Sequence, residues 1–277
     1  MSKKLITQLF LVSFVFAVSH LICDAQEITG FSMPLTAPVF GALPLKMSDS
    51  KMVMIIFKTT PEVLQKLVPK PLQPNPGNFA YVYTARFNPQ EHTGGDYSFP
   101  GGSYLEVALG VPVTFGKTPG NYIVVMYLDQ TLAGITIGRE IWGFPKKRAT
   151  VSFVEEDGKI SSSVERWGTT IVKIGFQRTE RVEPIPARPP TPTFNLKFIP
   201  SIKKNAPPDV MQLTSTTTEV RTKEFYKGNA TLEFGSLSAD PLGKIPILEI
   251  VRADYMVAEG ILGYGEVLYD YLAKEKK

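Results

Sequence analysis

The sequence predicts a mainly β fold, β-rich with a few helices, arranged as a barrel or a sandwich. Short runs of β-branched and aromatic residues recur along the chain and are separated by turn signals, a pattern typical of antiparallel β proteins. In the run Phe79–Phe87, larger aromatic and apolar side chains alternate with a second set. This period of two indicates a strand with one buried face.

Local signals locate the expected elements. Thr60 can cap a short helix that begins at Pro61. Glu156-Asp157-Gly158 signals a hairpin, because glycine adopts the positive φ that such turns require. Gln130–Glu140 is ambiguous by periodicity, and the proline-dense Pro184–Pro192 is interpreted as an extended connector within one domain. The expected strands are Met52–Lys58, Phe79–Phe87, Tyr104–Leu109, Val111–Phe115, Tyr122–Leu128, Thr150–Glu155, Lys159–Arg166, Thr169–Gln177, Phe194–Ile199, Met211–Val220, Thr231–Phe234, Ile247–Val257 and Glu266–Leu272.

The N-terminus has the pattern of a secretory signal peptide. Lys3 and Lys4 precede an apolar run from Leu5 to Ile22, and Ala25 provides a small residue for cleavage. An uncleaved membrane anchor is the alternative, but it needs about 20 consecutive apolar residues, and polar side chains interrupt this run. We therefore expect residues 1–25 to be removed and residues 26–277 to form one domain without stable membrane insertion, secreted or periplasmic.

The composition narrows the possible chemistry. The formal net charge is +4, and the basic residues are scattered among acids, so nothing marks a nucleic-acid surface. The single cysteine, Cys23, and the histidine His20 leave with the signal, and His92 lies in a glycine-rich loop. Thiol nucleophiles, Ser-His-Asp triads and histidine-based metal sites are poor candidates, whereas lysine, carboxylates and tyrosine remain.

The segment Gly138–Lys147, with the sequence GREIWGFPKK, is the first candidate site. It places Lys146 and Lys147 shortly after Trp142 and Phe144. Adjacent lysines usually lie on a solvated surface, but a neutral lysine beside apolar rings is a nucleophile toward carbonyl carbon. A lysine with the ordinary pKa of ~10.4 is neutral in only about one molecule in 2,500 at pH 7, so its surroundings have to disfavour the charge.

Two effects can disfavour that charge. Repulsion by Lys147, at ~6 Å and an effective dielectric constant of ~20, amounts to about 2.8 kcal/mol, roughly half of what ready attack requires. If the pair lies on extended chain, the two side chains also point to opposite sides. Desolvation should therefore contribute much of the effect, with Trp142, Phe144 and Met126 as candidate pocket walls.

The same segment carries a family resemblance. GREIWGFPKK, preceded by NYIVVMYLD (Asn121–Asp129) and followed by ILEIVRADYMVAEGILGYGEVLYDYL (Ile247–Leu272), resembles the acetoacetate decarboxylase family. MPLTAPVF (Met33–Phe40) and VLQKLVPKPL (Val63–Leu72) fit the same pattern. The resemblance thus covers nearly all of the chain after the signal segment.

The resemblance implies a mainly antiparallel β-barrel with a few peripheral helices, one of them over the ambiguous 130–140 segment, and assembly as a homo-oligomer. It implies that Lys146 forms a Schiff base with a β-keto acid after activation by desolvation or by Lys147, as is established for acetoacetate decarboxylase itself. It also implies that Glu106 positions the substrate and handles protons, without a metal or an organic cofactor. Arg139 and Glu140 are expected to form a structural ion pair.

Two departures from the family pattern leave the substrate open. The segment Asp49-Ser50-Lys51 lacks the arginine that the decarboxylases place near it to meet the substrate carboxylate. Lys51 can supply a charge there, but not the bidentate fork of an arginine. The strand Phe79–Phe87 lacks a second pocket glutamate, and Val82 lies near its place. Schiff-base formation is compatible with both changes.

Three functions are compatible with these residues. The leading one is a carboxy-lyase that decarboxylates an acetoacetate-like β-keto acid through an iminium on Lys146. The second keeps Lys146 but uses the enamine for aldol condensation or dehydration. The third is a binding protein whose barrel holds a small apolar or carbonyl ligand without turnover.

Overall fold

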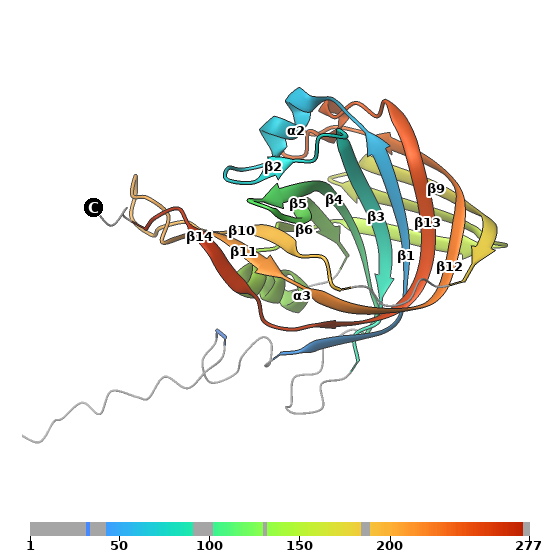
Figure 1. Cartoon of the computed structure of the whole chain (residues 1–277), viewed down its shortest axis with the longest axis horizontal. Coiled ribbons are helices and arrows are strands. Elements are labelled where there is room, and N and C mark those ends of the chain that lie inside the picture. Colours follow the sequence, from blue (N-terminus) through green and yellow to red (C-terminus); the bar gives the residue numbers. More distant parts are fainter. Residues whose placement is uncertain (1–31, 34–42, 91–101, 130–131, 184–188, 274–277) are drawn as a thin grey trace, which may run out of the picture. The chain divides into compact units, whose positions relative to one another are not determined.

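The computed structural model describes residues 32–33, 43–90, 102–129, 132–183 and 189–273 (Figure 1). The predicted signal peptide lies outside these residues, and so does His92. All elements named below belong to Val39–Lys277, which forms one compact unit. Within the described ranges, no helix is long and apolar enough to cross a membrane.

Strands make up most of this unit, and its helices are short. The helical elements are α2 (Pro61–Leu67), α3 (Leu132–Ile137), the π-helical turn η1 (Gly138–Trp142) and the 3-10 turn η2 (Leu242–Lys244). The strands are β1 (Leu45–Lys58), β2 (Gln73–Pro74), β3 (Phe79–Phe87), β4 (Tyr104–Phe115), β5 (Thr118–Leu128), β6 (Lys146–Arg148), β7 (Thr150–Glu156), β8 (Lys159–Arg166), β9 (Thr169–Val182), β10 (Thr193–Ile199), β11 (Val210–Thr216), β12 (Thr218–Phe234), β13 (Glu249–Leu262) and β14 (Glu266–Asp270).

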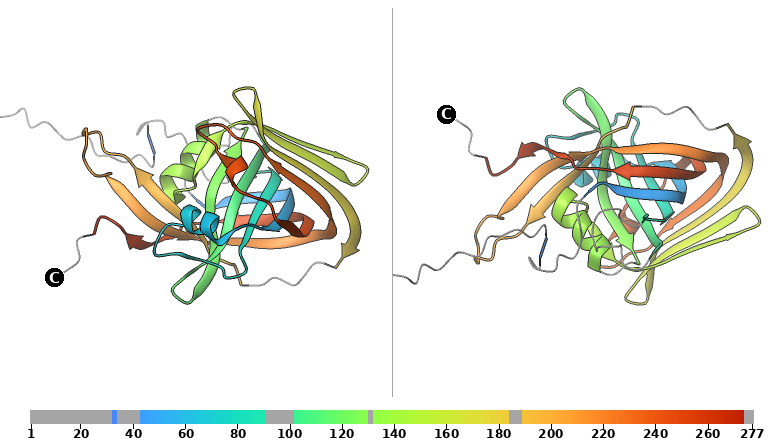
Figure 2. Two further views of the ribbon diagram at one scale, coloured as in Figure 1. Left: turned by 90° about the horizontal axis from the view of Figure 1, so that it is seen from above. Right: turned by 90° about the horizontal axis from the view of Figure 1, so that it is seen from below.

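These strands form one 14-stranded sheet. Its order is β14-β11-β10-β5-β4-β3-β1-β13-β12-β9-β8-β7, with β2 paired to β4 and β6 paired to β5. Most neighbours are antiparallel, but β6 and β10 both run parallel to β5. The hairpin of β7 and β8 extends to one side of the sheet, and β10 and β11 extend to the other (Figure 2).

The mainly β class is confirmed, but the expected barrel is not closed by hydrogen bonds. The described strands β7 and β14 are the two ends of the sheet and do not pair with each other. The sheet instead bends so that β7 packs over β1 and β3 through side chains. Arg86 donates to the carbonyl oxygen of Phe153 at 3.0 Å, and Lys51 pairs with Glu155 at 2.8 Å. Contacts of this kind need no backbone register, so the sheet can fold over without closing.

β3 is buried on both faces, whereas its alternation predicted one buried face. Ala80 and Val82 belong to the large apolar cluster that also contains side chains of β7, β8 and β9. Tyr81, Tyr83 and Ala85 belong to a second cluster, built with side chains of α3 and η1. Between the two clusters, residues 80–85 have no solvent face, so the alternation there separates larger side chains from smaller ones rather than buried from exposed ones.

Several boundaries differ from the prediction; β1, for example, begins at Leu45 rather than at Met52. β4 is one strand where two were expected, and its ladder with β5 shifts register between Leu109 and Gly110. A side chain at Gly110 would overlap the ring of Tyr81, so this glycine marks a close approach rather than a turn. The strand expected over 211–220 is divided, because β11 ends at Thr216 and β12 begins at Thr218.

Other local signals are confirmed. The side chain of Thr60 accepts a hydrogen bond from the backbone N–H of Val63 and caps α2, with Pro61 in the first turn. Asp157 and Gly158, with φ of 48° and 74°, form the turn between β7 and β8. The helix that the resemblance implied near residue 130 is present as α3 and η1.

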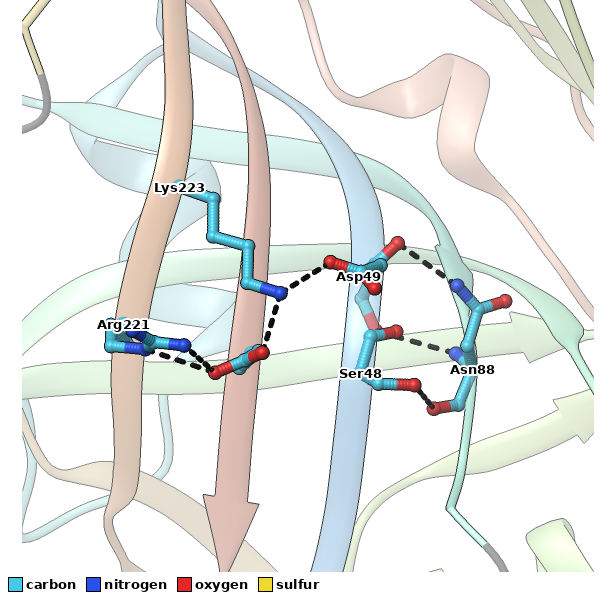
Figure 3. Close-up of polar contacts among 7 residues, drawn as sticks. Ser48, Asp49, Asn88, Arg221 and Lys223 are labelled. Atoms are coloured by element: carbon cyan, nitrogen blue, oxygen red, sulfur yellow. Dashed lines mark hydrogen bonds and ion pairs between the residues drawn. The ribbon is translucent and has the colours of Figure 1, made fainter.

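A polar network ties β12, β13 and β1 together at an irregularity of β1 (Figure 3). Asp49 has a φ of 42°, and the pairing of β1 with β13 shifts register beside it. Lys223 lies 2.6 Å from Asp49 and 2.5 Å from Glu259. The side-chain amide of Asn88 donates to the carbonyl oxygen of Asp49 at 2.9 Å. These contacts hold the irregular residue from two sides, from β12 beyond β13 and from the residue that follows β3.

Candidate active site

The segment Gly138–Lys147 forms a turn that delivers Lys146 to a short strand. η1 is followed by its C-terminal cap, Gly143, whose φ of 78° is a conformation that glycine adopts readily. The backbone N–H of Phe144 donates to the carbonyl oxygen of Gly138 at 2.9 Å and closes the turn. β6 then pairs parallel with β5, which places Lys146 beside Met126.

Lys146 and Glu106 form a buried ion pair. Nζ of Lys146 lies 3.2 Å from Oε2 of Glu106, and the two side chains are 8% and 3% exposed. Glu106 comes from β4, whose Ala108 lies opposite Met126, so the lysine and the carboxylate share one face of the sheet. The other carboxylate oxygen, Oε1, accepts a hydrogen bond from the hydroxyl of Tyr83 at 2.6 Å. Removing either ion would leave its partner as an uncompensated buried charge.

Aromatic rings enclose the amine. The ring centroids of Tyr104 and Phe144 each lie 5.7 Å from Nζ of Lys146. Trp142 lies behind Phe144, with 5.7 Å between their ring centroids. The structure thus gathers Met126, Trp142 and Phe144 in one buried cluster around the lysine. This setting desolvates the amine on the sides that face the rings.

Gly138 sets how closely the turn approaches the lysine. A Cβ at this position would lie 2.6 Å from Cδ and 2.7 Å from Cε of Lys146. These distances are too short for a carbon contact, so the missing side chain makes room for the lysine stem.

Lys147 points away from this site. Adjacent side chains alternate on the extended β6, and Nζ of Lys147 lies 2.9 Å from Oδ1 of Asp240. Asp240 also accepts a hydrogen bond from Tyr127 and pairs with Arg166. Burial would raise the pKa of Asp240, but the hydrogen bonds from Lys147 and Tyr127 hold it below its usual value. Lys147 therefore belongs to a separate ion-paired cluster and does not line the site around Lys146.

Neither position singled out for the missing family residues faces the site. Lys51 pairs with Glu155 on the face of β1 that carries Val53, and Val82 packs in the large cluster. Tyr83, the neighbour of Val82, is the residue of β3 that contacts Glu106. The sequence did not distinguish the two faces of β3, because both carry buried side chains.

Tyr83 and Tyr104 are site residues that the sequence analysis did not identify. Burial raises the pKa of both hydroxyls well above the usual value, and the negative charge of Glu106 raises it further. Both tyrosines therefore stay protonated at neutral pH. Their positions relative to Glu106 could have identified them, because Tyr104 lies two residues before Glu106 and Tyr83 lies on the adjacent strand.

Arg139 supports the turn rather than the chemistry. Its Nη1 donates to the carbonyl oxygen of Lys146 at 3.3 Å and links η1 to β6, in place of the ion pair expected with Glu140. In the part of the chain that the structure describes, no group of three or more His, Cys, Asp or Glu side chains is arranged to hold a metal ion.

The fold and the site define a mainly β protein that holds one buried lysine, paired with a carboxylate and walled by aromatic rings, in a position suited to react with a carbonyl carbon. Residues 32–272 match the family described as acetoacetate decarboxylase (ADC). The chain belongs to the acetoacetate decarboxylase family, and the resemblance seen in the sequence is confirmed.

The relatives span nearly the whole chain. The acetoacetate decarboxylase of Burkholderia lata is 33% identical over 250 residues, which cover 88% of this chain and 96% of the relative. That of Ralstonia nicotianae is 33% identical over 259 residues, with coverages of 91% and 99%. The chain is therefore related to carboxy-lyases along its length.

Solved structures show the same fold. The acetoacetate decarboxylase of Legionella pneumophila has a TM-score of 0.76 and 27% identity, and the match covers 89% of this chain and 96% of the other. The enduracididine biosynthesis enzyme MppR, complexed with pyruvate, has a TM-score of 0.75 at 18% identity, with coverages of 87% and 98%. At that identity MppR shares the fold alone.

Proposed function

We propose that the protein is a carboxy-lyase that decarboxylates an acetoacetate-like β-keto acid through an iminium on Lys146. The observation that carries this proposal is the buried pair of Lys146 and Glu106, 3.2 Å apart. An amine with a proton acceptor in reach, screened from water by rings, is the arrangement that addition to a carbonyl requires. Membership of the acetoacetate decarboxylase family supports the same assignment.

The proposed reaction can be written with this chain's residues. Oε2 of Glu106 accepts a proton from the ammonium of Lys146, and the neutral amine adds to the keto carbon. Glu106 returns the proton to the oxygen of that adduct, which takes a second proton from the adduct nitrogen and leaves as water, giving an iminium that keeps one N–H. The bond to the carboxylate then breaks, CO2 leaves, and the bonding pair moves toward the iminium nitrogen to form an enamine. A proton from solvent, passed through Glu106, adds to the enamine carbon, and hydrolysis releases the ketone and the lysine.

The negative charge of Glu106 stabilises the nitrogen of Lys146 at the start of the reaction and again at the iminium stage. The nitrogen of Lys146 is positive as the ammonium and again as the iminium. At the observed 3.2 Å, a unit charge pair in an effective dielectric constant of ~20 attracts by about 5 kcal/mol. An ammonium has to lose a proton before the nitrogen can attack, and Glu106 is the acceptor within reach.

A Schiff-base aldolase or dehydratase is the second candidate. In it, the enamine attacks a second carbonyl compound or takes part in loss of water, without release of CO2. The direction of Lys51 favours this alternative, because its amine pairs with Glu155 on the far face of β1. That part of β1 therefore offers no cation to a substrate carboxylate, and a neutral carbonyl substrate needs none. A binding protein without turnover is the third candidate.

We further propose, from the sequence of residues 1–25, that the mature protein is secreted or periplasmic. On the family resemblance, we propose that it assembles as a homo-oligomer. Its substrate would then be a small carbonyl compound that reaches it outside the cytoplasm.

Borohydride trapping tests the proposal. The protein is incubated with acetoacetate and a panel of β-keto acids and ketones, reduced, and mapped by peptide mass spectrometry. We expect a reduced adduct at Lys146 that is lost in Lys146→Ala and kept in the matched control Lys147→Ala. Release of CO2 from the same panel separates a lyase from an aldolase. Saturable binding with no adduct from any carbonyl would contradict the proposal and favour the binding protein.

A further inference from the structure

A buried tyrosine touches the site, and the reaction scheme above does not use it. Tyr83 on β3 is 8% exposed, and its hydroxyl donates to Oε1 of Glu106 at 2.6 Å. This distance is typical of an O–H group that donates to a charged carboxylate. The contact therefore ties β3 to the one acid beside Lys146.

The register of the sheet explains this contact. Ala85 pairs with Glu106, and Ala108 pairs with Tyr83. Both alanines are fully buried, so each of the two longer side chains has a small one directly opposite. Diagonal neighbours in an antiparallel ladder are roughly 7–8 Å apart, within reach of an aromatic side chain. The two alanines make the room in which Tyr83 and Glu106 meet.

The hydroxyl of Tyr83 remains a donor over the working pH range. Burial raises the pKa of Tyr83 well above its usual value of 10.0, and the charge of Glu106 raises it further. Oε1 of Glu106 is therefore occupied. Oε2 accepts no hydrogen bond from the described residues and is the oxygen that faces Nζ of Lys146.

We propose that Tyr83 is the positioning residue of this site, which fixes the rotation of the Glu106 carboxylate so that Oε2 takes and returns the proton of Lys146. Without the hydrogen bond, the carboxylate can turn about its terminal torsion, which is a broad one. The proton acceptor then no longer faces the amine. This inference rests on the proposed function, because it assigns Tyr83 to the proton transfer that precedes attack.

The test compares Tyr83→Phe with Tyr81→Phe. Tyr81 lies on the same face of the same strand, but it packs beside Gly110 rather than Glu106, so it is a matched control for loss of a buried hydroxyl. The readout is acylation by acetic anhydride over a series of pH values, measured separately at Lys146 and Lys147 by peptide mass spectrometry. Borohydride trapping with the carbonyl panel is measured in parallel.

In Tyr83→Phe, we expect acylation and trapping of Lys146 to slow by about 10- to 100-fold, the size of a hydrogen bond to a charged group. The pH profile of Lys146 acylation should be displaced, Lys147 should be unaffected, and Tyr81→Phe should behave as the wild type. If Lys146 is acylated with the same rate and pH dependence in Tyr83→Phe and Tyr81→Phe, the proposed role of Tyr83 is wrong, but the proposed function is unaffected. Equal slowing at both lysines would point to a loosened fold and would also count against it.

The experiments distinguish failure of the proposed function from failure of the role assigned to Tyr83. If the wild-type protein forms no adduct with any carbonyl, the proposed function is wrong. The acylation comparison still decides the role of Tyr83, because it needs no substrate.

Discussion

Replacing Gly138 by alanine tests whether the turn sets the position of Lys146. The added Cβ would lie 2.6 Å from Cδ, 2.7 Å from Cε and 3.3 Å from Nζ of the lysine. Carbon atoms in contact are about 3.5–4.0 Å apart, so the lysine stem has to move by roughly 1 Å. A displacement of that size at a reacting group costs about 100-fold in rate. We expect borohydride trapping at Lys146 to fall by about that factor.

The fold of Gly138→Ala should survive. Gly138 lies in a helical turn, where alanine is favoured over glycine by about 0.5–1 kcal/mol, and the overlap involves a flexible side chain. Overpacking costs about 1–3 kcal/mol, so the melting temperature should fall by no more than several degrees. Gly263→Ala is the control, because a Cβ there meets nothing within 4 Å. Unchanged trapping in Gly138→Ala, with the melting transition intact, would refute the idea that this glycine determines where the amine lies.

Three further substitutions give distinct signatures. Glu106→Gln keeps the shape of the side chain but removes the base, so trapping should slow by about 100- to 10,000-fold, and an ordinary rate would exclude Glu106 as the proton acceptor. Asp240→Ala leaves the largely buried Arg166 without its carboxylate and should cost about 3 kcal/mol in urea unfolding at neutral pH. Because the folded-state pKa of Asp240 is lowered, this stabilisation is present above the usual aspartate pKa and is lost as the pH falls through the folded value, so the difference from wild type should shrink in acid. Burial raises the pKa of Asp254 despite its pairing with Arg252, so the folded protein binds this proton more tightly than the unfolded chain does. Asp254 therefore loses stabilising effect as the pH rises, and Asp254→Asn should be more stable than wild type at neutral pH but not in acid; higher neutral-pH stability of the wild type would contradict this.

The parts of the fold that depend on neighbouring residues could be predicted from the sequence. The cap at Thr60, the hairpin turn at Gly158 and most strand positions follow from local signals. Strand ends that depend on distant side chains could not be predicted. The glycine that seemed to break β4, Gly110, is required by the ring of Tyr81 on another strand. Whether the sheet closes depends on whether its two end strands, β7 and β14, pair with each other, and no local sequence pattern predicts that pairing.

The site divides in the same way. The sequence identified Lys146 and Glu106 through the family resemblance, and extended-chain geometry anticipated that adjacent lysines would point apart. The partner of Lys147, Asp240, lies 93 residues further along the chain, and no spacing rule could have found it. Tyr83 was overlooked because the face of β3 that meets the lysine becomes evident only once η1 and its apolar cluster are in place.

The two lysines of β6 have the same side chain but different partners, Glu106 for Lys146 and Asp240 for Lys147. A slip of β6 by one residue would bring Lys147 to Glu106 and Arg148 to Asp240, so each carboxylate would still meet a cation. A one-residue deletion just before the two lysines would therefore keep a lysine beside Glu106, but it would be Lys147 instead of Lys146. The number of residues between Gly138 and the lysines therefore decides which lysine stem lies beside this glycine, and in this chain it is that of Lys146. In comparing relatives, the spacing between that glycine and the lysines is thus more informative than the presence of the lysines themselves.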